Sequence, residues 1–170
     1  LNTTGSLNAF FGKDAGILNT SGSENSFFGY AAGGSNQAGC CNSFFGRSAG
    51  QLNTNGISNT FIGGGAGGNN TVGSQNTFVG LLAGNANVSG NSNTLIGDQA
   101  DVSINNLNFA TAIGAGTIVS SSNTVVLGRN LDTVQIPGVL NVAGSFSANA
   151  FNAATQFNIG GNRVLSTSGL

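Results

Sequence analysis

The chain has 170 residues, of which only 5% are charged, and its formal net charge is −1. Histidine is absent, so the commonest general base and every Ser-His-Asp or Cys-His arrangement are missing, and we expect no enzyme and no cofactor. The four basic residues form no stripe that would bind nucleic acid, and no run of about 18 apolar residues predicts a membrane helix.

A five-residue motif that closes on glycine recurs through the first two thirds of the chain. Its copies are residues 8–12, 25–29, 42–46, 59–63, 76–80 and 93–97, and residues 110–114 are a degenerate copy. The step is 17 residues each time, and a period this short and strict predicts stacked coils. We expect residues 1–128 to form an all-β, parallel β-roll or β-solenoid of 17-residue coils, packed as a homotrimer.

Three glycine columns divide each coil into segments that are too short for helices. They are represented by Gly56, Gly63 and Gly67, and all three are expected to mark turns because glycine adopts positive φ without steric cost. Two asparagine columns, represented by Asn53 and Asn59, accompany them. Stacked amides can hydrogen-bond along the stack, either as a ligand-binding ladder or to hold the corners. We favour the corners, since each asparagine lies near a turn glycine.

Two neighbouring apolar columns hold eight of the chain's twelve phenylalanines. The first holds Phe10, Phe27, Phe44, Phe61, Phe78, Leu95 and Ala112, and the second holds Phe11, Phe28, Phe45, Ile62, Val79, Ile96 and Ile113. Neighbouring residues on a strand face opposite ways, so one column fills the coil and the other faces outward. An outward apolar ridge several coils long needs a partner, and copies of the same chain around an axis would supply one.

The few residues with distinctive chemistry point to no site. Cys40 and Cys41 are adjacent, in columns that tolerate many residue types, and we expect free or inter-chain thiols without a metal. Asp98 and Asp101 are the clustered carboxylates of the array. They are interpreted as charged corners rather than as a calcium site, because calcium takes six or more ligands.

Residues 129–170 differ in kind from the array and are expected to form a β-hairpin connector. Residues 133–136 and 139–142 predict two strands about a turn at Pro137 and Gly138. Residues 157–159 and 163–165 predict a second hairpin.

The end of the chain resembles an earlier part of the array. Residues 166–170 are similar to residues 19–23, so we expect this segment to meet the N-terminal edge of a following array, in the same longer chain or in the next subunit. The residues expected at this joint are Phe157, Ile159, Val164, Leu165 and Leu170. Because the chain starts at Leu1 and carries no signal peptide, we expect a mature form or an excised segment.

The repeat resembles the head of the YadA-like trimeric autotransporter adhesins. The resemblance rests on Asn59-Thr60-Phe61-Ile62-Gly63 and on residues 123–128, and it covers about residues 2–128. It implies a left-handed parallel β-roll, three of which pack as one trimer, and extracellular adhesion; it transfers no catalytic residue. The period here is longer and the columns are richer in phenylalanine. Residues 129–170 resemble connectors of phage tail fibres and bacterial surface fibres.

The preferred function is a non-enzymatic structural module of an extracellular fibre or surface adhesin, which displays or spaces adhesive surfaces. The first alternative is the subunit of a head-to-tail filament or a phage tail-fibre segment. A solenoid that binds ice or glycans is a further alternative, but a flat ice-binding face favours paired threonine columns. Only one column is threonine-rich here, and Ser26 and Ser43 interrupt it.

Overall fold

A computed structural model describes residues 2–145 in full and, beyond them, the backbone of residues 156–159 and 162–166. The chain divides into two compact units, residues 1–134 and residues 135–170. The described residues form no helix, and therefore no helix that could cross a membrane. The first unit contains the repeat array and the second contains one antiparallel hairpin.

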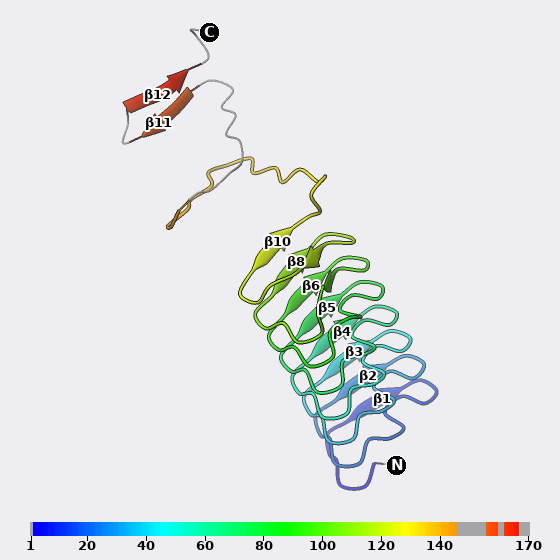
Figure 1. Ribbon diagram of the computed structural model, residues 1–170. Helices are drawn as coiled ribbons and strands as arrows, with labels where there is room; N and C mark the ends of the chain where they lie inside the picture. Colours follow the sequence, from blue (N-terminus) through cyan, green and yellow to red (C-terminus); the bar gives the residue numbers. More distant parts are fainter. Residues whose placement is uncertain (1, 146–155, 160–161, 167–170) are drawn as a thin grey trace. The chain divides into compact units, whose positions relative to one another are not determined.

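The array is a parallel β-solenoid of about seven coils, in which each coil contributes one short strand to a common sheet (Figure 1). The eight strands, in their order across the sheet, are β1 (Ala9–Phe11), β2 (Ser26–Phe28), β3 (Ser43–Phe45), β4 (Thr60–Ile62), β5 (Thr77–Val79), β6 (Thr94–Ile96), β8 (Thr111–Ile113) and β10 (Val125–Leu127). From β1 to β8 each residue pairs with the residue 17 positions later, which confirms the predicted coil period. Coils 1 to 7 are numbered below in 17-residue steps from Asn2, so that coil 4 is residues 53–69.

The first apolar column fills the inside of the coils. Phe27, Phe44, Phe61 and Phe78 are fully buried, and their rings stack with centroids 4.8 Å apart. This spacing is that of neighbouring strands, as expected for coils stacked through backbone hydrogen bonds. The core is therefore a one-dimensional column of rings, in which each coil covers the next.

The asparagine columns hold the corners, as predicted, but they do so in two different ways. The amide of Asn53 donates to Asn36 Oδ1 at 2.8 Å in the preceding coil, so this column is a side-chain ladder. Asn53 also donates to Gly56 O at 3.1 Å in its own coil. In the other column the side chain of Asn59 bonds to backbone alone: its Nδ2 donates to Gly73 O at 2.8 Å and its Oδ1 accepts from Asn76 N at 3.0 Å. These asparagines are fully buried, so their amides face no ligand.

Two of the three glycine columns have the positive φ that was predicted, and the third does not. Gly63 has φ 133° and Gly67 has φ 56°, as expected for turns. The column of Gly56 is absent from the positive-φ residues, and the prediction of a left-handed turn there is wrong. A Cβ on Gly56 would overlap Asn53 Oδ1 and the carbonyl oxygen of Gly73, so close approach between coils is what requires glycine.

Two further columns of left-handed positions, filled mostly by residues other than glycine, were not predicted from the sequence. One such column is Leu7, Glu24, Cys41, Ser58, Gln75, Ser92 and Phe109, and the other is Asp14, Ala31, Ser48, Leu82 and Gln99, with Gly65 and Gly116 among them. Their φ values lie between 52° and 66°. The hydrogen-bonded stack imposes this conformation on whatever side chain occupies the position, at a cost of about 1 kcal/mol each.

The last coils depart from the regular pattern. In the sequence the step from Gly114 to Gly128 is 14 residues, which predicts a shorter coil, and β10 pairs with β8 across that coil. A second small parallel sheet forms from β7 (Asp101–Val102) and β9 (Ile118–Val119). Here an extended segment replaces the glycine turn of the earlier coils.

The connector agrees with only one of its two predicted hairpins. The chain bends at Pro137 and Gly138, but residues 133–136 and 139–142 form no strands, so the first hairpin is wrong. Its apolar side chains, such as Leu131 and Val139, are exposed, and no face packs to hold a ladder together. The second hairpin is confirmed, as β11 (Gln156–Ile159) pairs antiparallel with β12 (Asn162–Ser166).

Candidate interaction surface

The three-residue strands sort the two apolar columns onto opposite faces of the sheet. In β4 the middle residue Phe61 is buried, whereas Thr60 is half-buried and Ile62 is exposed. The same alternation repeats along the sheet, so the first column is the core and the second lies outside, which confirms that the two columns separate. We call the outward column the ridge; it consists of Phe11, Phe28, Phe45, Ile62, Val79, Ile96 and Ile113.

The ridge is continuous and apolar, and none of residues 2–145 covers it. Phe45 is 40% exposed, and Phe11 on the edge strand is 73% exposed. The rings of Phe28 and Phe45 stack with centroids 4.9 Å apart and planes within 4°. Stacked rings cover each other's faces, so the aromatic part of the ridge turns ring edges outward. An interacting surface would therefore meet ring edges and aliphatic side chains.

A column of hydroxyl groups runs beside the ridge on the same face. It holds Ser26, Ser43, Thr60, Thr77, Thr94 and Thr111, all half-buried. Among residues 2–145, no hydrogen bond involves the side chains of these six residues. The face thus combines one apolar column with one column of hydroxyls that remain available to water or to a partner.

The acidic residues of coil 6 have separate environments. Asp101 accepts hydrogen bonds from Ala86 N at 2.9 Å and from Val102 N at 2.8 Å, which ties its carboxylate to the backbone of two coils. Burial nevertheless raises the pKa of Asp101, since desolvation outweighs these two bonds. Asp98 is exposed on the surface. Within the described part of the chain, no three His, Cys, Asp or Glu side chains gather where a metal ion could bind.

The two cysteines are free thiols, with Cys40 half-buried and Cys41 exposed. Cys41 has φ 61°, so it occupies one of the left-handed positions. A hydrogen bond with Cys40, followed by burial, raises the pKa of the Cys41 thiol. A raised pKa lowers the thiolate fraction, which makes Cys41 a poorer nucleophile at neutral pH.

Only some of the residues expected at the joint lie in the described part of the chain. Phe157 and Ile159 lie on β11, and Val164 and Leu165 lie on β12, where the backbone alone is described. Leu170 lies outside the described residues. The head-to-tail joint therefore stays a prediction.

No protein-family model and no curated protein matches this chain. The candidate surface is therefore argued from the chain's own columns and their geometry.

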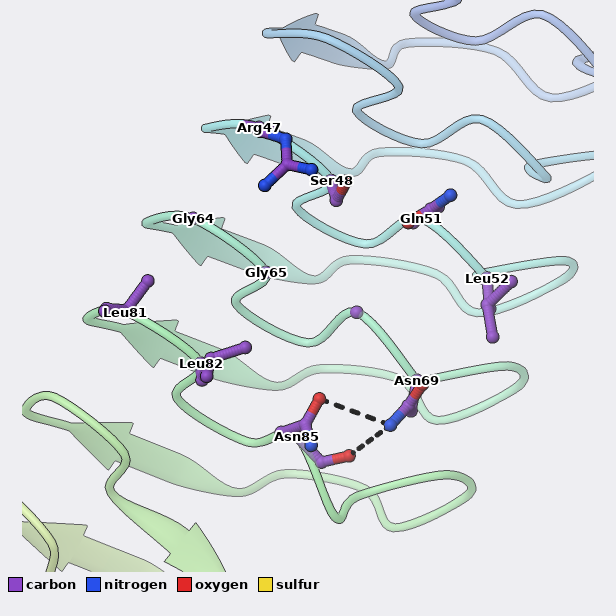
Figure 2. A pocket seen from close by; sticks show the side chains of 11 residues that line it. Arg47, Ser48, Gln51, Leu52, Gly64, Gly65, Asn69, Leu81, Leu82 and Asn85 are labelled. Atoms are coloured by element: carbon purple, nitrogen blue, oxygen red, sulfur yellow. Dashed lines mark hydrogen bonds between the residues drawn. The ribbon is translucent and has the colours of Figure 1, made fainter.

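One surface feature was not predicted from the sequence. Coil 4 carries glycine at positions 64, 65 and 68, and a hollow of about 450 Å³ lies beside it (Figure 2). The signal is present in the sequence as Gly63-Gly64-Gly65-Ala66-Gly67-Gly68, but only Gly63 and Gly67 belong to the columns expected to mark turns, and the three extra glycines were left without an interpretation. Gly64 and Gly68 lie outside the positive-φ set, so at these two positions glycine removes a side chain from the surface without being required by the turn.

Proposed function

We propose that this chain is a non-enzymatic structural module of an extracellular fibre or surface adhesin, built as a homotrimeric, left-handed β-roll that displays or spaces adhesive surfaces. The observation that carries the proposal is the ridge. It is an unbroken apolar column on the outer face of a solenoid whose inner face is already filled.

The ridge supports self-association because its length and its chemistry match those of an identical copy. A contiguous exposed apolar strip of this length is unusual on a soluble monomer. Copies arranged in parallel around an axis would place each ridge residue against its own counterpart, coil by coil. Closed rotational symmetry is the common solution for such contacts. The resemblance to the YadA-like heads favours three copies.

The low charge and the regular coil stack support a structural role. In a stack of this kind, stability grows with the number of coils, and length can change without altering the cross-section. A rigid spacer or display surface uses both properties. The resemblance, rather than any single residue, favours an extracellular position and adhesion.

The test compares two neighbouring phenylalanines with opposite surroundings. Phe45→Asp places a charge on the ridge, and we expect a folded protein of one-third the native mass by light scattering. Phe44→Asp places a charge in the filled core, where it has no partner, and should unfold the coil. The control is Ile57→Asp, because Ile57 is 43% exposed, much like Phe45, but lies outside the ridge.

Two outcomes would overturn the proposal. One is a wild-type protein that is monomeric at all accessible concentrations. The other is an assembly that Ile57→Asp disrupts as strongly as Phe45→Asp, since the ridge would then have no special part in it.

The alternative function is the subunit of a head-to-tail filament. It is favoured by the edge of the sheet, where β1 pairs with β2 alone and Phe10 is only partly buried. Open strand edges recruit further strands. Deleting residues 157–170 distinguishes this alternative: a filament joined through that segment would shorten to single units, whereas a trimer held by the ridge would keep its mass.

The binding of ice or glycans is less well supported by the same face. There is one hydroxyl column rather than two, and the neighbouring rings turn their edges outward. Sugars stack on ring faces, and these faces are already covered by the next coil.

A further inference from the structure

The hollow beside coil 4 lies next to two exposed leucines of coil 5. Gly64 and Gly65 add no side chain to the surface, and Leu81 and Leu82 occupy the same two columns one coil later (Figure 2). The two leucines lie close to these glycines: Leu81 Cδ1 would be 3.3 Å from a Cβ on Gly64, and Leu82 Cδ2 would be 2.7 Å from a Cβ on Gly65. Leu81 is 54% exposed and Leu82 is 40% exposed. A depression and an apolar projection are thus neighbours on one face, which we call the notch face.

Charges of opposite sign flank this pair at equal distances in sequence. Arg47 precedes Gly64 by one coil, and Asp98 follows Leu81 by one coil, in the same column. Both side chains are exposed. Among residues 2–145 the one ion pair is Arg129 with Asp132, so Arg47 and Asp98 have no charged partner within this part of the chain.

Reversing the direction of one copy makes the notch face complementary to itself. A two-fold axis that crosses the face between coils 4 and 5 would set coil 4 against coil 5 of the second copy and coil 3 against its coil 6. Each position would then face the same column in the other copy. The opposed residues would be Gly64 with Leu81, Gly65 with Leu82, Gly68 with Asn85, Arg47 with Asp98 and Tyr30 with Ala115.

The complementarity holds for size and for charge. Leu81 and Leu82 of each copy would face the hollow beside Gly64 and Gly65 of the other, whose wall that copy's own Leu81 and Leu82 help to form, and each Arg47 would face an Asp98. A parallel arrangement in equal register would instead oppose Gly64 to Gly64 and Arg47 to Arg47, leaving the hollow empty and like charges together. Two-fold contacts of this kind are self-complementary and closed.

We propose that the notch face binds a second copy of this chain in antiparallel orientation, about a two-fold axis between coils 4 and 5. The ridge takes no part in this contact. If the ridge forms a trimer, the notch face joins two trimers, and if it does not, the notch face joins two single chains. The proposal therefore goes beyond the proposed function and does not depend on it.

The experiment measures mass against concentration by sedimentation, at low ionic strength, for the wild type and four variants. Arg47→Asp and Asp98→Arg each oppose like charges across the two-fold axis, and each should raise the dissociation constant roughly tenfold or more. The double variant Arg47→Asp/Asp98→Arg restores opposite charges and should return the dissociation constant close to the wild-type value. The control Glu24→Arg changes a charge in a different column and should have little effect.

A fifth variant tests shape instead of charge. Gly64→Leu should abolish pairing, because the added side chain fills the hollow. A Cβ on Gly64 meets only Leu81 Cδ1 at 3.3 Å, and Gly64 is outside the positive-φ set, so the fold should tolerate the change. Circular dichroism and a thermal melt check that the variant is folded.

The outcomes separate this proposal from the ridge. Loss of a two-fold mass step in Arg47→Asp, with recovery in the double variant, supports the notch face, whereas Phe45→Asp should remove the three-fold step alone. The proposal is wrong if the wild type shows no two-fold step up to millimolar concentration, or if the double variant pairs no better than the single ones.

Discussion

Coils 1 to 5 and the last coils of the array fill the same interior with different residues. In the regular coils one phenylalanine reaches across the coil and its ring lies over a glycine, as Phe44 does over Gly50. A Cβ on that glycine would overlap the ring, and its φ of 57° also suits glycine. The ring and the left-handed glycine are therefore one packing unit.

In coils 6 and 7 the interior is filled from both sides. The inward residue shrinks from Phe78 to Leu95 and then to Ala112, and buried Val102 and Val119 enter from the opposite segment. That segment is extended, as β7 and β9, and needs no glycine. The comparison shows that a filled interior, rather than any one residue type, is what the coils share.

The largest expected effect comes from moving a coil 6 residue into a regular coil. Gly50→Asp adds a side chain against the Phe44 ring at a left-handed position, and we expect it to cost about 4 kcal/mol from strain and overpacking. The triple variant Phe44→Leu/Gly50→Asp/Gln51→Val copies the solution of coil 6 and should recover part of that loss. Urea unfolding at constant protein concentration measures both. If the triple variant is no more stable than Gly50→Asp, the two solutions are not interchangeable.

The second-largest effect is expected in the column of Asn59, where coil 7 has Ala110 in place of asparagine. Asn59→Ala removes the acceptor of Asn76 N and one donor to Gly73 O, both buried, and should cost about 2–3 kcal/mol. Exposed Asn55→Ala serves as the control and should change the unfolding free energy by less than about 0.5 kcal/mol. Equal effects of the two substitutions would contradict the role given to the buried amide.

A smaller effect of opposite sign is expected where the stack forces a side chain into the left-handed region. Ser58 has φ 57° and is exposed, so Ser58→Gly should stabilise the protein by about 0.5–1 kcal/mol. Asn55→Gly, at a position outside the positive-φ set, should destabilise it slightly through backbone entropy. Thermal melting of the two variants side by side checks the sign. A loss of stability in Ser58→Gly would mean that the stack does not strain this position.

The smallest effect is a pH dependence that belongs to coil 6. The pKa of Asp101 is raised in the folded state by burial, so the folded chain holds this proton more strongly than the unfolded chain. Its contribution to stability is favourable below the ordinary pKa of 3.8 and is lost as pH rises through the folded value. Asp101→Asn should remove this decrease in stability with rising pH.

The measurement is the difference in urea midpoint between wild type and Asp101→Asn from pH 3 to pH 7. Asp132, whose pKa Arg129 holds below its usual value by a hydrogen bond, titrates in both proteins and cancels from the difference. A difference that stays constant with pH would show that Asp101 has the same proton affinity in both states.

Much of the array was predictable because a strict sequence repeat implies a repeated structural unit of the same length. The 17-residue step predicted the stacked parallel strands, and the glycine interval of 14 predicted the short coil before β10. The connector was harder. Residues 133–142 have the alternating pattern and the Pro-Gly turn of a hairpin, yet no ladder forms, because a hairpin without a packed face has too little burial to offset its ordering entropy.

The sequence by itself determined the coil period, the alternation of the strands and the presence of one inward and one outward apolar column, because these follow from spacing along a single chain. Only the tertiary structure decided which column is inside. The column of Phe44 is the one whose rings lie over the left-handed glycines, which leaves Phe45 on the surface. It also decided why Gly56 is glycine and where side chains are forced to positive φ, because both depend on how closely one coil approaches the next.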